Sequence, residues 1–260
     1  MHPMLNIGIR AARAAGDHIV RYMDRIEGMS ITSKGRNDFV TEVDKQAELI
    51  IIDIIHKAYP QHSILAEESG EQGKGEYKWI IDPLDGTTNY LHGFPHFAVS
   101  IALEHKGELD QAVVYDPLKQ ELFTASKGGG AYLDNRRIRV SQRKSLEGAL
   151  LGTGFPFRDH DKLDVFLETF RAFFPMTAGI RRAGAASLDL AYVACGRLDG
   201  FWEFGLYEWD IAAGALLIQE AGGFTHKLNG PDNKMITACI IASNPKISED
   251  MKTIIIKYFN

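Results

Sequence analysis

The first sixty residues contain two stretches in which apolar side chains recur at the spacing of an amphipathic helix. In the first, the apolar residues from Leu5 to Met23 can share one helix face, which predicts a helix over about 5–23. The second begins at Thr41, and Asp44 follows three residues later in the arrangement of a capping box. Its apolar positions predict a helix that ends before Pro60.

Between about residue 63 and residue 133 the pattern changes to short apolar runs separated by Gly or Pro, which is typical of strands joined by turns. The runs are Ser63–Ala66, Tyr77–Ile81, Phe97–Leu103, Gln111–Tyr115, Glu121–Thr124 and Ala131–Leu133. They predict that the first half consists of helices followed by a mostly antiparallel sheet.

In the second half, expected helices alternate with expected strands. The helices are 163–173, 186–194, 209–221 and 248–258, and the strands are 149–152, 200–203 and 238–242. This alternation predicts an α/β layer. We therefore expect an α+β subdomain at 1–145 and an α/β subdomain at 146–260. Because no flexible linker marks the join, the two should pack together.

The composition is that of a globular protein, with 45% hydrophobic and 24% charged residues. A net charge of −5 argues against broad, non-specific nucleic-acid binding, which needs clustered Lys and Arg. No apolar run approaches the roughly 20 residues of a membrane span, and the two cysteines, Cys195 and Cys239, form no CxxC pair. We expect a cytoplasmic protein with no membrane partner.

The most informative segment is WIIDPLDGTTN at residues 79–89. An apolar strand ends at Asp82, Pro83 stops the ladder of hydrogen bonds, and Asp85 follows within one turn. Gly86 permits close approach of a ligand, and Thr87 can begin a helix. Two carboxylates beside a helix start suit a hard cation together with a phosphate group. Taken alone, the segment is also explained as an Asp- and Gly-rich turn that caps a helix.

Two further acidic motifs favour the cation site over a simple capping turn. Glu67 follows the short strand at 63–66, although paired glutamates are usually solvated, and Asp210 lies in the first turn of a helix, where it can simply complement the helix dipole. His92 and His96 flank the 79–89 segment without the spacing of paired ligands, and we interpret both as ordinary loop residues.

The motifs WIIDPLDGTTN at 79–89 and WDIAAG at 209–214 resemble those of the inositol monophosphatase family, and their occurrence in this order is highly specific. Supporting matches are AEES at 66–69, Lys34 with DFVTEVD at 38–44, and Glu203. The opening residues and 184–194 look most like the enterobacterial branch, which includes antitermination factors. The resemblance implies an Mg²⁺-dependent, lithium-sensitive phosphatase with α-β-α-β-α layers, an antiparallel sheet first, usually as a homodimer.

The resemblance also implies a site with two to three Mg²⁺ ions. Glu67, Asp82 and the Leu84 carbonyl would hold the first ion, Asp82, Asp85 and Asp210 the second, and a looser third would lie near Glu67. The chemistry agrees, because several carboxylates close together cannot all stay ionised without cations.

Catalytic and substrate-binding residues follow from the same resemblance. Thr87 would help Glu67 orient and deprotonate a metal-activated water for in-line attack on the phosphate, and Asp44 would support Thr87. The Gly86 and Thr87 amides would bind phosphate oxygens. The substrate alcohol would contact Gly184, Ala185, Ala186 and Glu203, and Lys34 and Asp38 would approach the metals. Ala185 stands where other members carry Thr or Ser.

The preferred function is hydrolysis of inositol 1-phosphate to inositol and phosphate. Related phosphatases suggest fructose 1,6-bisphosphate, 3′-phosphoadenosine 5′-phosphate or histidinol phosphate as alternative substrates. A different class of function is binding to RNA or to a transcription complex, with polymerase or a Nus factor as partner, because certain bacterial relatives also act in antitermination. Scattered arginines could supply a basic surface, but the negative net charge favours ordinary solvated positions.

Overall fold

The computed structural model describes residues 2–23, 31–35, 38–156, 160–229 and 236–259. Its helices are α1 (Pro3–Tyr22), α2 (Glu42–Ala58), α3 (Thr87–Leu91), α4 (Leu163–Phe173), α5 (Ala186–Ala194), α6 (Glu208–Glu220) and α7 (Ser248–Phe259). Within this part of the chain, no helix is both long and apolar enough to cross a membrane.

The larger sheet belongs to the first half of the chain. Its strands are β3 (Ser63–Ala66), β4 (Gly70–Gln72), β5 (Tyr77–Asp85), β6 (Ala98–His105), β7 (Glu108–Asp116), β8 (Glu121–Ser126), β9 (Gly130–Leu133) and β10 (Arg136–Arg137). Their order is β10-β9-β8-β7-β6-β5-β3-β4. Neighbouring strands run antiparallel except for β3 and β5, which are parallel, so the ends of β3 and β5 lie at the same edge.

The second sheet is mixed. It contains β11 (Leu150–Thr153), β12 (Gly179–Arg181), β13 (Gly200–Tyr207), β14 (Phe224–Asn229) and β15 (Ile236–Ser243), in the order β12-β11-β13-β15-β14. β11 is parallel to both of its neighbours, whereas β15 is antiparallel to β13 and β14. A separate hairpin pairs β1 (Ile31–Gly35) with β2 (Asp38–Thr41).

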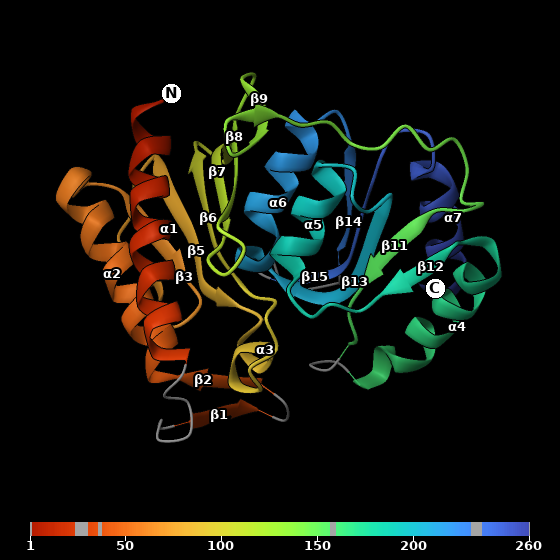
Figure 1. Ribbon diagram of the computed structural model, residues 1–260, viewed down its shortest axis with the longest axis horizontal. Helices are drawn as coiled ribbons and strands as arrows, with labels where there is room; N and C mark the ends of the chain where they lie inside the picture. The colour runs from red at the N-terminus through yellow and green to blue at the C-terminus, as the bar shows by residue number, and fades with distance from the viewer. Residues whose placement is uncertain (1, 24–30, 36–37, 157–159, 230–235, 260) are drawn as a thin grey trace.

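The helices and sheets stack in five layers (Figure 1). Helices α1 and α2 cover the outer face of the larger sheet, α5 and α6 lie between the two sheets, and α4 and α7 cover the far side of the second sheet. Three apolar clusters fill the spaces between these layers, represented by Trp79, Leu216 and Trp202. The expected α+β fold with α-β-α-β-α layers is therefore confirmed.

Most of the expected elements are present with small shifts at their ends. Helices α4 and α5 have the predicted bounds, and the capping box predicted for α2 forms between Thr41 and Asp44. The sequence pattern did not predict β14, a short strand at the sheet edge with mixed polar and apolar residues. The two main sheets lie on either side of residue 145, but the division into subdomains 1–145 and 146–260 stays a prediction.

Candidate active site

The end of strand β5 places two carboxylates beside each other through a bulge. The sequence predicted that the strand would end at Asp82, but pairing with β6 resumes at Asp85 after a shift in register. Pro83 lies inside this irregular stretch, where its missing N–H removes no regular ladder bond. The Leu84 N–H donates to Asp82 Oδ1 at 3.0 Å and closes the turn.

Four carboxylates from three parts of the fold lie near this turn. Glu67 follows β3, and its N–H donates to the Ile81 carbonyl at 3.1 Å, which places it beside the end of β5. Asp210 comes from the first turn of α6. Burial raises the pKa of Asp82 well above its usual range, and the charges of Glu67, Asp85 and Asp210 raise it further.

In the described residues, these four side chains are not arranged as the ligands of a single metal ion. Among the described residues, no group of three or more His, Cys, Asp or Glu side chains is arranged to hold a metal ion. Protein donors already bind one oxygen of Asp85 and of Asp210, from Ser187 and from the Tyr207 N–H respectively. The donor set still fits a hard divalent cation, because it consists of buried and half-buried carboxylate oxygens whose negative charges repel one another.

Asp85 also joins the two halves of the chain. Its Oδ2 accepts hydrogen bonds from the Ser187 N–H at 2.7 Å and from the Ser187 hydroxyl at 2.5 Å. Helix α5 has no side-chain cap from its own N-cap residue, Ala185, so Asp85 supplies that cap from the other half. Burial raises the pKa of Asp85 to about 6, while the hydrogen bonds from Ser187 oppose this rise.

Asp44 and Thr87 are in direct contact. The Thr87 hydroxyl lies 2.9 Å from Asp44 Oδ1 and 3.0 Å from the Leu84 carbonyl oxygen. Asp44 Oδ2 accepts from the Thr41 N–H at 2.9 Å and from the Thr41 hydroxyl. Burial raises the pKa of Asp44 to about 6, the bonds from Thr41 and Thr87 oppose the rise, and Glu67 adds to it. The capping box of α2 thus fixes Asp44 against Thr87.

The Gly86 backbone approaches the turn that precedes α5. Gly86 has φ +94°, and a Cβ there would lie 3.0 Å from the His96 carbonyl oxygen, so only glycine fits. Ala185 and Ala186 are 1% and 6% exposed as whole residues, whereas Gly184 is half-buried, so Gly184 is the more accessible part of this turn. Gly184 also has a positive φ, +91°.

Glu203 differs from its predicted position at the end of a strand. β13 continues to Tyr207, so Glu203 lies inside the strand opposite Ile240, and its side chain is buried. The structure links it to the carboxylates around β5 through Asp189, a buried residue of α5 that sequence analysis missed. Burial raises the pKa of Asp189 well above its usual range, and the charges of Glu203 and Asp85 raise it further.

His96 is not the ordinary loop residue that we expected. It is buried, and its Nε2 has no hydrogen-bond partner within the described residues. Burial lowers the pKa of His96 to about 4, and the Lys119 ammonium lowers it as well. The side chains of Lys34 and Asp38 lie outside the described residues. Sequence analysis also gave no role to Ser187 or Asn89, because their contacts join distant segments.

The sequence matches a known protein family along almost its whole length. The model of the inositol monophosphatase family matches residues 1–259. The chain belongs to the inositol monophosphatase family. Members of this family generally depend on Mg²⁺, which agrees with the donor chemistry at the end of β5. Membership also supports phosphatase activity.

Relatives within the family carry two kinds of name. The Nus factor SuhB of Pseudomonas aeruginosa is 59% identical, over 98% of this chain and 96% of the relative. A crystal structure of the extragenic suppressor protein SuhB from Bartonella henselae is 42% identical with a TM-score of 0.93, covering 98% of both chains. SaIMPase-II from Staphylococcus aureus, solved with inositol monophosphate bound, is 25% identical with a TM-score of 0.79, covering 97% and 93% of the two chains.

Proposed function

We propose that the protein is an Mg²⁺-dependent phosphatase that hydrolyses inositol 1-phosphate to inositol and inorganic phosphate. The observation that carries the proposal is the electrostatic contact of Asp82 with Glu67, Asp85 and Asp210. A phosphate ester is an anion, and these carboxylates would repel it unless divalent cations lay between them. Family membership and the relative with bound inositol monophosphate support the reaction and the substrate.

In this proposal Glu67, Asp82, the Leu84 carbonyl, Asp85 and Asp210 hold two to three Mg²⁺ ions. When bound, Mg²⁺ supplies charge neutralisation at the phosphoryl oxygens and lowers the pKa of a water molecule. The protein fixes the carboxylates in advance, because Leu84, Ser187 and the Tyr207 N–H each hold one of them in place.

The attacking water is oriented by Thr87, which Asp44 supports, and is deprotonated by Glu67. The Thr87 hydroxyl has a single proton to donate, to Asp44 or to the Leu84 carbonyl, so its oxygen can accept a hydrogen bond from the water. Glu67 takes the proton of that water. The water oxygen bonds to phosphorus opposite the ester oxygen, the bond from phosphorus to the ester oxygen breaks, and the leaving oxygen takes a proton from solvent.

The substrate is held by its two ends. The N–H groups of Gly86 and Thr87, at the start of α3, bind phosphate oxygens, because the first N–H groups of a helix have no partner inside it. The alcohol lies against the backbone of Gly184, Ala185 and Ala186, and the Glu203 carboxylate accepts hydrogen bonds from its hydroxyl groups.

Phosphate release from purified protein tests this function. We expect the highest kcat/KM with inositol 1-phosphate, and lower values with fructose 1,6-bisphosphate, 3′-phosphoadenosine 5′-phosphate and histidinol phosphate. Chelation should abolish turnover, Mg²⁺ should restore it, and Li⁺ should inhibit it. A higher kcat/KM with another ester would contradict inositol 1-phosphate as the substrate. No phosphate release from any of these esters in Mg²⁺ would contradict the proposed phosphatase activity.

A second role in transcription antitermination is proposed from the relatives, since a protein 59% identical over almost the whole chain is named a Nus factor. The test is binding of purified RNA polymerase or Nus factors to immobilised protein. Wild-type and Asp85→Asn protein should bind equally, because the role does not need catalysis. No retention of polymerase or any Nus factor by either protein contradicts this role.

We also propose a homodimer. The outer face of α4 exposes Leu163 and Leu167, and the following turn exposes Phe174 and Met176. Neighbouring exposed apolar side chains of this kind mark interfaces between proteins. Light scattering after size-exclusion chromatography should give twice the chain mass, and Leu167→Glu should shift the protein toward monomer. A wild-type monomer at all concentrations contradicts the dimer.

A further inference from the structure

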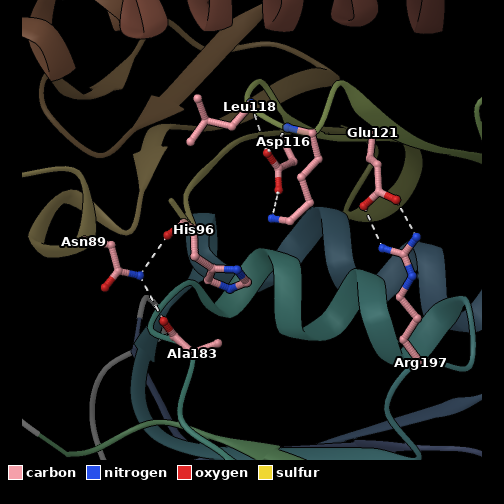
Figure 2. Close-up of polar contacts among 8 residues, drawn as sticks. Asn89, His96, Asp116, Leu118, Glu121, Ala183 and Arg197 are labelled. Carbon is pink, nitrogen blue, oxygen red and sulfur yellow. Dashed lines mark hydrogen bonds and ion pairs between the residues drawn. The ribbon is translucent and has the colours of Figure 1, made fainter. Parts of the chain in front are cut away.

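Two segments about a hundred residues apart are tied together beside the proposed substrate site. Asn89, in α3, donates from Nδ2 to the Ala183 carbonyl at 2.9 Å and to the Gly184 carbonyl at 3.3 Å. The same nitrogen donates to the His96 carbonyl at 2.8 Å. Figure 2 shows the Asn89 carboxamide between the His96 and Ala183 carbonyls, one from each half of the protein.

The backbone turn at 183–187 is therefore held at both ends. Asn89 binds its first two carbonyl groups, and Asp85 binds the Ser187 N–H and hydroxyl at its end. Between these two anchors lie Ala185 and Ala186, which the proposed function places against the substrate alcohol. Both anchors come from the same short segment, 85–89, that carries the proposed phosphate-binding amides.

The two segments touch without spare room. A Cβ at Gly86 would lie 3.3 Å from Ala185 Cβ and 3.3 Å from the Gly184 carbonyl oxygen. A Cβ at Gly184 would lie 3.1 Å from Asn89 Nδ2. A small displacement of the Gly184 turn would therefore change the distance between the phosphate-binding amides and the surface that meets the alcohol.

The Asn89 carboxamide can hold the two segments together because its nitrogen donates more than one hydrogen bond. A carboxamide nitrogen carries two protons in a fixed plane, and Asn89 shares them among three carbonyl groups. An apolar side chain of similar size would fill the space but would leave those carbonyls without this donor, and lost buried hydrogen bonds are costly.

We propose that Asn89 is a positioning residue that fixes the turn at Gly184–Ala186 relative to Gly86 and Thr87, and that it thereby sets the selectivity for the alcohol part of the ester. This inference rests on the proposed phosphatase function. Asn89 itself need not touch the substrate, since its nitrogen is engaged with the three carbonyl groups.

The test compares two esters that share a phosphoryl group and differ in the alcohol: inositol 1-phosphate and p-nitrophenyl phosphate, which has no polyol. For Asn89→Leu and Asn89→Ala we expect KM for inositol 1-phosphate to rise about tenfold, the size of effect that loss of one hydrogen bond gives. The kcat for this ester should change little, and both constants for p-nitrophenyl phosphate should stay within about twofold of wild type.

Asn244→Ala is the matched control. Asn244 is fully buried, and its Nδ2 donates to the Ser141 hydroxyl at 2.9 Å and to the Arg143 carbonyl at 3.2 Å, away from the proposed site. This variant should lose thermal stability without changing the ratio of the two KM values. An equal loss for both esters in the Asn89 variants, or no loss for either, would overturn the positioning role.

Amide hydrogen exchange separates this inference from the proposed function. In the Asn89 variants, the amides of residues 184–188 should exchange faster than in wild type, whereas Asn244→Ala should leave them unchanged. If wild-type protein released no phosphate from any ester in Mg²⁺, the proposed function would fail, and the exchange result would decide the positioning role by itself. Unchanged exchange in Asn89→Leu and Asn89→Ala would overturn it.

Discussion

The chain contains the tripeptide Asp-Pro-Leu twice, each time at the end of a strand, and the two copies have different surroundings. Asp82 and Asp116 are both 1% exposed. In both copies the leucine N–H donates to the aspartate Oδ1, at 3.0 Å from Leu84 and at 3.1 Å from Leu118. Both copies therefore form the same hydrogen bond from backbone to carboxylate, although the first lies in the irregular end of β5 and the second leads into the turn after β7.

The residue that follows each tripeptide determines the charge beside the buried aspartate. Lys119 follows the second copy, and its ammonium lies 2.6 Å from Asp116 Oδ2. Asp85 follows the first copy and adds a further negative charge beside Asp82. Asp116 has a cationic partner within its own turn, whereas the charges that raise the pKa of Asp82 come from three other carboxylates, an arrangement that favours a cation bound between them. This contrast points to the cation site.

The largest expected effect comes from Asp85→Asn, which keeps the shape of the first turn and removes a proposed ligand. We expect kcat/KM to fall about a thousandfold or more, because a metal ion contributes several kcal/mol to such reactions. The metal-free variant should melt no lower than wild type, since a mutually repelling carboxylate is gone. Steady-state kinetics and thermal melting measure both. Retained turnover with normal Mg²⁺ dependence contradicts the assignment.

Thr87→Ala should lower kcat about a hundredfold, within the range expected for losing a group that orients a proton-transfer step. KM should change less, because the backbone amides remain. Thr88→Ala is the matched control, since Thr88 is the exposed neighbour in the same helix and should keep wild-type kinetics. An equal fall in kcat for Thr87→Ala and Thr88→Ala would contradict the proposed role of Thr87 in orienting the water.

The pH dependence of stability should report the raised pKa values of two carboxylates at the proposed site, Asp44 in α2 and Asp85 at the end of β5. Burial raises the pKa of Asp44 and of Asp85 to about 6, so the metal-free folded state binds protons that the unfolded state has released. The free energy of unfolding should therefore fall as pH rises from about 4 to 6, by on the order of 2 kcal/mol for each of the two groups. Saturating Mg²⁺ should reduce this slope. Urea unfolding across this pH range checks it, and a slope of opposite sign is the contrary result.

Lys119→Met removes the counter-charge of the second turn and should produce the smallest effect. We expect a loss of about 1 kcal/mol in unfolding free energy, because the pair is half-exposed on the lysine side. Activity and its Mg²⁺ dependence should stay at wild-type levels. Urea unfolding and steady-state kinetics are the measurements. A change in Mg²⁺ dependence would show that the two turns are not independent.

The sequence pattern predicted the elements whose apolar spacing is regular, such as α4 and α5, but not the edge strand β14, whose residues mix polar and apolar side chains. The motifs also led to the prediction of Asp82, Asp85, Glu67 and Asp210 as metal ligands, which stays a prediction, although they could not show that these side chains lie near one another. The two Asp-Pro-Leu tripeptides are identical, and the charge of the following residue, Asp85 or Lys119, is the local signal that separates them.

Contacts between the two halves could not be predicted in this way. Ser187 and Asn89 act through partners about a hundred residues away, and neither has a local pattern that distinguishes it from other polar residues. His96 and Glu203 are buried because distant elements cover them. Such roles depend on how the layers pack and not on the spacing of residues along the chain.

The most direct test is a crystal structure of the protein soaked with Mn²⁺ and inositol 1-phosphate, with anomalous scattering used to locate the ions. We expect ions held by Asp82 together with Glu67, Asp85 and Asp210, so that both halves contribute ligands, and the phosphate group of the ester against them. An active protein whose ions lie elsewhere, with Asp82 bound to none, would contradict the account.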